Sequence, residues 1–442
     1  MKQKIYKRKR IIPVGWKEIK LGDVFRTSSG STPLSTEKSY YEGGVIPWIN
    51  SGELASPYIY KTSNYITQKG FENSSTELYP KDTVLVAMYG ATAGKASLLK
   101  LEACTNQAIC AILPNEDYCP EFIKYNIDTL YEHLVGLSSG SARDNLSQAG
   151  LKELKLVLPK TKKEQEKLVS VLSLLDRKIE LNRQINDNLE AMAKQLYDYW
   201  FVQFDFPNEE GKPYKSSGGA MVWNEDLHMS IPCTWKTCLL SDYISSNNTG
   251  DWGFDEPAKK KSIKVGCIRG ADIVKLNNLP IRYIKDNNTS KLLSAWDIVI
   301  EVSGGSPTQA TGRSAFVTPG VLKRNGGNLT CSNFCHAFTM KDHKASAYFY
   351  FMWRMFYDNN NMFNFEGKTS GIKNFMTDTF LANKWLDVPT ALLYLFFERV
   401  KVIYEQIDNN IEEVNTLTKQ RDELLPLLMN GQASVNYHLS DD

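Results

Sequence analysis

Three short segments contain residue types that could support catalysis or ligand binding. The first is YGATAGKA at 89–96, which has glycines and a lysine in the order of a phosphate-binding loop. Only three residues separate Gly90 from Gly94, however, and Ala96 stands where magnesium chemistry needs Ser or Thr. The spacing therefore argues against a nucleotide site.

The other two segments offer possible metal ligands. Asp297 and Glu301 form half of a metal-nuclease pattern, but a serine stands where such a site carries its lysine. Cys331, Cys335 and His336 lie close together without the CxxC pair that is typical of structural zinc sites. Buried thiols in a reducing compartment explain the cysteines more simply. We therefore predict no metal site, no catalytic residue and no disulfide.

Wider searches for enzyme motifs point in the same direction. The chain contains neither the NPPY-type tetrapeptide of an amino-methyltransferase nor a GxGxxG segment after a strand that could hold a dinucleotide or methyl donor. Its histidines form no recognisable constellation; they are His133, His228, His336, His343 and His438. These features favour a binding protein over an enzyme.

Length and composition limit the architecture. A chain of 442 residues exceeds a single core, which stops growing at roughly 250–300 residues, so at least two domains are expected. The net charge of +2 gives no global argument for nucleic-acid binding, and any DNA surface must be local. The longest apolar stretch, Ala391–Phe397, is too short to span a bilayer, and no apolar leader precedes Pro13. We expect a cytoplasmic protein without a membrane segment.

An internal repeat is the strongest organisational signal. The N-terminal series of Ile12, Pro13, Trp16, Lys17, Leu21 and Asp23 recurs as Ile231, Pro232, Trp235, Lys236, Leu240 and Asp242. Further along, Asp82, Val84, Gly94, Lys95, Asn106 and Asn145 find partners in Asp297, Val299, Gly312, Arg313, Asn333 and Asn374. The chain is therefore predicted to contain two similar halves.

Each half ends in a long predicted helix. Apolar residues follow heptad spacing from Leu168 to Trp200 and again from Phe396 to Leu428, as in a packed helical seam. Asn182 and Asn410 occupy the same position of the two seams, where buried polar groups would fix the register at some cost in stability. The alternative is that both asparagines are simply exposed to solvent.

Strand-like runs precede each helix, at Thr83–Met88, Ile109–Leu113 and Ile298–Val302, and predict mixed α/β domains. Glycine, proline and serine are frequent over Pro207–Gly219, which predicts a surface linker. The predicted order is therefore globular domain, helix, linker, globular domain, helix.

With these segments in place, the sequence resembles the specificity subunit of type I restriction-modification systems over essentially its full length. The segments that carry the resemblance are IPVGWKEIKLGDV at 12–24, YGATAGKASLL at 89–99, GSARDNLS at 140–147, LPKTKKEQEKLVSVLSLLDRKIELN at 158–182 and FDFPNEEGKPYKSSGGAMVW at 204–223. IPCTW at 231–235 then restarts the series.

The resemblance implies an α+β fold with two similar mixed α/β target-recognition domains, separated by two long helices packed as an antiparallel coiled coil, in an internal pseudo-two-fold repeat. The expected parts are a first recognition domain at 1–158, a helical spacer at 159–204, a linker at 205–230, a second recognition domain at 231–388, a second spacer at 389–430 and a tail at 431–442.

The resemblance also implies function and partners. Each recognition domain would read one half of a bipartite DNA target, while the helices set the spacing and dock two DNA methyltransferase subunits. Restriction/translocase subunits complete such complexes, and S-adenosylmethionine, ATP and Mg²⁺ are expected on those partners and not on this chain. The alternative is a coiled-coil scaffold without DNA recognition. The second helix departs from the pattern, since Pro389 is followed by Thr390 and Ala391 where the first copy has Glu164 and Gln165; the two docking sites could therefore differ in strength.

Base reading needs side-chain donors and acceptors placed in a groove, whereas Lys and Arg contacts to phosphate add mostly non-specific affinity. Polar, glycine-containing loops supply the candidates. The predicted DNA-binding residues are Tyr89, Thr92, Lys95, Arg143 and Asn145 in the first domain and Ser306, Thr308, Arg313, Lys368, Lys373 and Asn374 in the second. For each of them, a role as a turn residue is the alternative.

Overall fold

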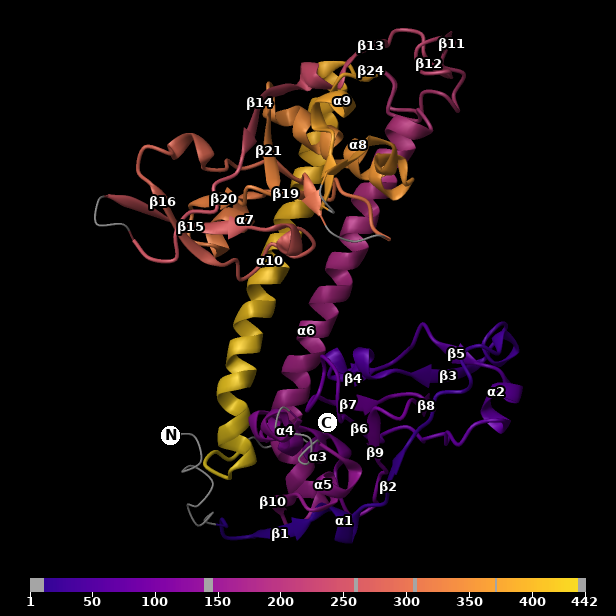
Figure 1. Cartoon of the computed structure of the whole chain (residues 1–442), viewed down its shortest axis with the longest axis vertical. Helices are drawn as coiled ribbons and strands as arrows, with labels where there is room; N and C mark the ends of the chain where they lie inside the picture. The colour runs from indigo at the N-terminus through magenta and orange to yellow at the C-terminus, as the bar shows by residue number, and fades with distance from the viewer. Residues whose placement is uncertain (1–11, 139–145, 258–260, 305–307, 370–371, 436–442) are drawn as a thin grey trace. The chain divides into compact units, whose positions relative to one another are not determined.

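The computed structural model describes residues 12–138, 146–257, 261–304, 308–369 and 372–435 (Figure 1). The chain divides into two compact units. Unit 1 comprises residues 1–180 and 415–442, and unit 2 comprises residues 181–414. The division falls inside the two long helices, because each half-helix packs against the globular domain next to it. Within the described residues, every helix is too short or too polar to cross a lipid bilayer.

Unit 1 is built on a five-stranded sheet in the order β2-β9-β6-β7-β4. A three-stranded sheet, β5-β3-β8, and an antiparallel pair, β1-β10, complete it. The strands are β1 Trp16–Lys20, β2 Thr27–Ser29, β3 Ile46–Ile49, β4 Tyr58–Ile59, β5 Tyr65–Ile66, β6 Val84–Ala87, β7 Ala96–Leu99, β8 Cys104–Thr105, β9 Ile109–Ile112 and β10 Lys155–Pro159. The helices are α1 Leu21–Val24, α2 Gln68–Glu72, α3 Pro120–Asp128, α4 Tyr131–Ser138, α5 Gln148–Lys152 and the first half of α6 Lys162–Tyr197.

Unit 2 repeats this topology. A four-stranded sheet, β14-β21-β17-β19, matches β2-β9-β6-β7, and β16-β15-β20 and β13-β24 match the two smaller sheets. The strands are β11 Met221–Asn224, β12 Met229–Pro232, β13 Lys236–Leu239, β14 Ile244–Thr249, β15 Ser262–Ile268, β16 Ile281–Lys285, β17 Ile298–Glu301, β18 Ser303–Gly304, β19 Ser314–Phe316, β20 Leu329–Cys331, β21 Cys335–Met340, β22 Glu366–Thr369, β23 Ile372–Phe375 and β24 Lys384–Asp387. The helices are α7 Pro319–Arg324, α8 Ser346–Asp358, α9 Thr377–Leu381 and α10 Thr390–Met429, whose last turns belong to unit 1. The predicted internal repeat is thus confirmed at the level of strand order.

The register of the repeat differs by one residue from the sequence prediction. Asp82 corresponds to Trp296 and not to Asp297: both have positive φ angles, of 66° and 73°, and their amides donate to the carbonyls of Leu99 and Val317. Hydrogen bonding places Ala87 opposite Gly94 and Glu301 opposite Gly312. The structural partner of Val84 is therefore Ile298. The two units repeat the backbone geometry at this position but not the residue type. Pairing Asp82 with Asp297 because both are aspartates is therefore wrong by one residue.

Two features of unit 2 are not found among the described residues of unit 1, which leave out residues 139–145. A three-stranded sheet, β18-β23-β22, lies beyond the end of β17, and α7 lies between β19 and β20. The first copy connects β7 to β8 directly. The two α/β domains are therefore similar in their core, and α7 is an insertion of unit 2 between β19 and β20.

The segment predicted as a linker, 205–230, is more structured than its composition suggests. Phe204 and Phe206 are buried, and the Phe206 ring stacks on Trp235 at 5.1 Å between centroids. β11 and β12 form an antiparallel hairpin inside this segment. Aromatic burial in unit 2 thus holds a connection that glycine and proline content alone would leave as a surface loop.

The two helices begin in different ways. In α6, the Thr161 hydroxyl accepts from the amide of Glu164, and buried Gln165 donates to the Pro159 carbonyl. α10 starts at Thr390, where the carbonyl of Pro389 accepts from the amide of Leu393. The departure noted in the sequence therefore changes the cap but does not shift the start of the helix.

In unit 2, α6 and α10 pack antiparallel. Asn182 donates to a Glu413 carboxylate oxygen at 2.7 Å, and Asn410 donates to the Asn186 side-chain oxygen at 2.7 Å. Both Asn182 and Asn410 are buried, at 3% and 6% exposure. The two asparagines do not pair with each other, and each has its own partner across the seam.

Replacing both Asn182 and Asn410 with leucine tests their proposed role in setting the register. We expect mixed oligomeric states and a broadened melting transition, because leucines pack in several registers whereas these amides have one set of partners. Light scattering and calorimetry of the full chain measure both properties. Asn409→Leu, at the exposed neighbouring position on α10, is the control. A double variant with one oligomeric state and one sharp transition contradicts the register role.

Candidate nucleic-acid interface

The YGATAGKA segment joins the antiparallel strands β6 and β7. Gly90 and Gly94 have φ angles of 89° and 81°, which only glycine adopts without strain. The segment is a β-turn region and is not followed by a helix, unlike a phosphate-binding loop. Gly312, at φ 95°, makes the same turn in unit 2.

Three of the predicted residues of unit 1 lie in this segment, and their side chains differ in exposure. Tyr89 is 48% exposed, whereas Thr92 is buried and its hydroxyl donates to the Ser51 carbonyl at 2.6 Å. Lys95 is half-buried, and its amine has no partner among the residues that the structure describes. Arg143 and Asn145 lie outside the described residues.

Arg313, the counterpart of Lys95, is bound within the domain. Its guanidinium donates to both carboxylate oxygens of Glu301, at 2.6 and 2.8 Å, and to the Gly270 carbonyl. Hydrogen bonding to Glu301 raises the pKa of Arg313, and Glu301 is only 5% exposed. In unit 1, Ala87 occupies the position of Glu301, which explains why Lys95 has no equivalent ion pair. Contact between Arg313 and DNA stays a prediction.

Among the other predicted residues of unit 2, Lys373 and Asn374 lie in β23 of the β18-β23-β22 sheet. The Ser303 hydroxyl donates to the side-chain oxygen of Asn374 at 2.6 Å. Lys373 forms an ion pair with Glu366 at 2.9 Å and lies over the ring of Phe363. Thr308 is exposed at the surface. Ser306 and the side chain of Lys368 lie outside the part of the chain that the structure describes.

The possible metal ligands have other roles in the structure. The buried Asp297 carboxylate accepts from the Ser294 amide at 2.7 Å, and burial raises its pKa. Cys331 and Cys335 are buried, while His336 faces the Asn247 side-chain oxygen at 2.8 Å, and burial lowers the pKa of His336. In the described ranges, no three His, Cys, Asp or Glu side chains are grouped as metal ligands would be.

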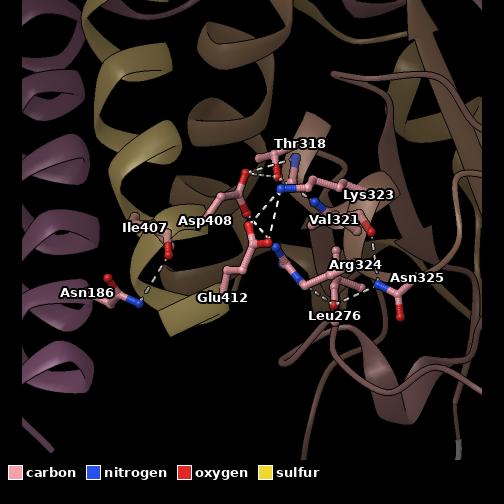
Figure 2. A network of polar contacts seen from close by, with 11 residues as sticks. Asn186, Leu276, Thr318, Val321, Lys323, Arg324, Asn325, Ile407, Asp408 and Glu412 are labelled. Carbon is pink, nitrogen blue, oxygen red and sulfur yellow. Dashed lines mark hydrogen bonds and ion pairs between the residues drawn. The ribbon is translucent and has the colours of Figure 1, made fainter. Parts of the chain in front are cut away.

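A carboxylate on each long helix anchors the adjacent domain. In unit 2, Asp408 of α10 accepts from the Thr318 hydroxyl at 2.5 Å, from the Gly320 amide and from Arg324 at 2.6 Å (Figure 2). One turn later, Glu412 pairs with Lys323 at 2.9 Å. Asp408 thus holds α7, the insertion of unit 2, on the helix.

The anchor extends from α7 into the rest of the domain. The Arg324 guanidinium also donates to the Leu276 carbonyl, and Asn325 donates to the same carbonyl (Figure 2). Val321 of α7 is buried with Leu276 and Leu329 in the core beside the β16-β15-β20 sheet. A side chain of α10 therefore holds α7 and, through α7, the core beside the β16-β15-β20 sheet.

Unit 1 uses a different anchor. Asp176 of α6 is buried, accepts from the Tyr125 hydroxyl at 2.6 Å and pairs with Arg421 of α10 at 3.0 Å. Tyr125 lies on α3 and also contacts the Tyr58 hydroxyl. Sequence reasoning missed both anchors. Acidic residues beside a heptad seam are a weak signal, because most such residues face solvent.

Comparison with known proteins agrees with this architecture. Residues 13–191 match the family model of the type I restriction modification DNA specificity domain. The chain is 29% identical to the type I restriction enzyme MjaIX specificity subunit of Methanocaldococcus jannaschii, over 96% of this chain and 95% of the relative. It is 21% identical to the HindI specificity subunit of Haemophilus influenzae, over 94% and 99% of the two chains.

A solved structure shares the fold at low sequence identity. The crystal structure of the type I restriction-modification system S subunit from M. genitalium superposes with a TM-score of 0.55 at 16% identity, covering 98% of this chain and 99% of that one. The duplicated α/β domain and the two long helices fit the same assignment as the sequence relatives, which are named as specificity subunits and not as scaffolds. Over nearly its full length the chain is similar to specificity subunits of type I restriction-modification systems, and its residues 13–191 match the model of the DNA specificity domain of that family.

Proposed function

We propose that this chain chooses the DNA sequence on which partner subunits act and that it catalyses no reaction itself. The observation that carries the proposal is the duplicated α/β domain, each copy anchored by a buried or nearly buried aspartate to its own segment of the long helices. Two similar domains on one chain suit a DNA target with two half-sites. The helices set the spacing between the two half-sites that the domains recognise.

The partners follow from the same reading. Double-stranded DNA is bound by both domains, two methyltransferase subunits dock on the helices, and restriction/translocase subunits join the complex. S-adenosylmethionine, ATP and Mg²⁺ bind to those partners. The modest net charge of +2 suits a chain whose partners supply much of the phosphate neutralisation.

Mapping of methylated bases tests the proposal. A host that expresses this chain with its methyltransferase should methylate one bipartite sequence, with two specific halves around a non-specific spacer. Expression of the methyltransferase without this chain is the control and should leave that sequence unmethylated. Methylation that is unchanged by removal of this chain would favour the scaffold alternative.

The two docking surfaces for methyltransferase are expected to differ in strength. The outward face of α6 carries the exposed apolar residues Leu174, Leu181, Ile185 and Met192. The positions of α10 with the same spacing in the repeat are Val402, Asn409, Glu413 and Gln420. An apolar face excludes water over more area than a polar one and so binds more tightly for equal fit.

Titration of methyltransferase subunit into the full chain measures this difference. Isothermal calorimetry should give two binding steps whose affinities differ by at least about tenfold. This ratio corresponds to a difference of about 1.4 kcal/mol in binding free energy. Leu181→Gln should weaken the tighter step and leave the weaker one unchanged. Two indistinguishable steps would contradict the prediction.

A further inference from the structure

An exposed carboxamide occupies the same structural position in each unit. In unit 1, the turn after β8 exposes Gln107, whose side-chain oxygen accepts from the Thr32 hydroxyl at 2.6 Å. The loop that carries Thr32 crosses the end of β8, because the Ser31 amide donates to the Thr105 carbonyl at 3.0 Å. A Cβ at Gly30 would collide with that carbonyl, so the crossing requires glycine.

The same crossing occurs in unit 2. The Asp251 amide donates to the Cys331 carbonyl at 2.8 Å, and a Cβ at Gly250 would collide with this carbonyl. Next to it, the exposed Asn333 accepts at its side-chain oxygen from the Trp252 amide at 3.0 Å. A backbone amide can only donate, so the orientation of the Asn333 carboxamide is fixed.

Both turns border the segments that carry predicted DNA-binding residues. In unit 1, the carbonyl of Ala108 accepts from the amide of Met88, which precedes Tyr89. In unit 2, the carbonyl of Phe334 accepts from the amides of Val302 and Ser303. Gln107 and Asn333 are therefore equivalent residues, each next to the end of the central strand of its sheet.

The chemistry of the two side chains is directional. Each carbonyl oxygen is held by a neighbouring loop, and neither NH₂ group has a partner among the described residues. An exposed, oriented NH₂ donor matches the acceptors that purines and thymine present in the major groove, namely N7, O6 and O4. We propose that Gln107 and Asn333 are base-reading residues that donate from their side-chain NH₂ groups to base acceptors, one in each half-site. This inference rests on the proposed function and names contacts within it.

The test replaces each carboxamide by the isosteric acid. Gln107→Glu still accepts from Thr32, and Asn333→Asp still accepts from the Trp252 amide, so the fold is retained while a donor becomes an acceptor. The complex of the full chain with its methyltransferase selects from randomised double-stranded DNA, and the selected pool is sequenced. Each variant should lose the wild-type preference at one position of one half-site by at least about tenfold, in favour of bases that present an amino donor. Gln203→Glu, an exposed amide-to-acid change near the end of α6, is the matched control and should leave both half-sites unchanged.

The outcomes separate the alternatives. Changes confined to different half-sites for the two variants support the assignment. Uniformly weaker binding with an unchanged consensus identifies phosphate contacts and overturns base reading. An unchanged consensus at unchanged affinity also overturns base reading. A wild-type complex that enriches no bipartite consensus overturns the proposed function and this inference with it.

Discussion

Asp408→Ala is expected to lower the free energy of unfolding of unit 2 by about 3 kcal/mol. The side chains of Asp408 and Arg324 are each only 12% exposed, so the variant leaves a nearly buried guanidinium without its carboxylate. Removing one member of a buried pair typically costs about 3–5 kcal/mol, and the residual exposure places this pair at the low end. The Thr318 hydroxyl and the Gly320 amide lose their acceptor as well. Denaturant unfolding measures the loss, and hydrogen exchange should locate it in α7.

Glu412→Ala is the matched control. Glu412 lies one turn from Asp408 on the same helix and contacts the same short helix through Lys323, but the two side chains are 58% and 72% exposed. Exposed pairs contribute about 0–1 kcal/mol, so this variant should unfold almost as the wild type does. Equal destabilisation by Asp408→Ala and Glu412→Ala would show that Asp408 does not anchor α7.

The helices and the repeat could be predicted because their signals are periodic and long. The heptad series from Phe396 falls within α10, and the series from Leu168 falls within α6 except for Trp200, which lies in the π-helical turn Asp198–Val202 directly after it. The three predicted strands are confirmed as β6, β9 and β17. A helix or strand that buries one face carries apolar residues at a regular spacing. This spacing can be recognised in a single sequence.

The detailed correspondence between the halves could not be predicted from residue types. Asp82 and Trp296 share a backbone conformation and hydrogen-bonding pattern, but no chemistry links their side chains. Likewise, Gln107 corresponds to Asn333, although the sequence pairs Asn106 with Asn333. Loops of different length shift the register, and only strand pairing restores it.

Candidate contact residues were the hardest part to predict. Arg313 and Lys95 align in sequence, yet Glu301 binds Arg313 internally while Lys95 faces Ala87 and has no such partner. Whether a cation is available to DNA depends on a residue that lies on the neighbouring strand. A single sequence does not reveal that pairing.

The position of Arg421 illustrates the same point within a helix. It falls in the apolar seam of α10, where the first copy has Ala193, and a charged residue there looks like an interruption of the pattern. In unit 1 it neutralises the buried Asp176, whose counterpart at the same spacing is Tyr404. The same two positions of the helix pair therefore hold an ion pair, Asp176 with Arg421, in unit 1 and two buried residues, Tyr404 and Ala193, in unit 2.

Arg421→Ala is therefore expected to destabilise unit 1 by about 3–5 kcal/mol. Among the described residues, it leaves the Asp176 carboxylate, at 2% exposure, with the Tyr125 hydroxyl as its one hydrogen-bond partner. Asp422→Ala is the control, since Asp422 also contacts Arg421 but is 60% exposed. The double variant Asp176→Ala/Arg421→Ala should lose clearly less than the sum of the two single variants, because no unpaired charge remains buried. Strict additivity in denaturant unfolding would mean that the two charges are not coupled. The loss in free energy of unfolding could also be smaller for the double variant than for either single variant. That result would show that the pair specifies how the two helices pack and does not add to stability.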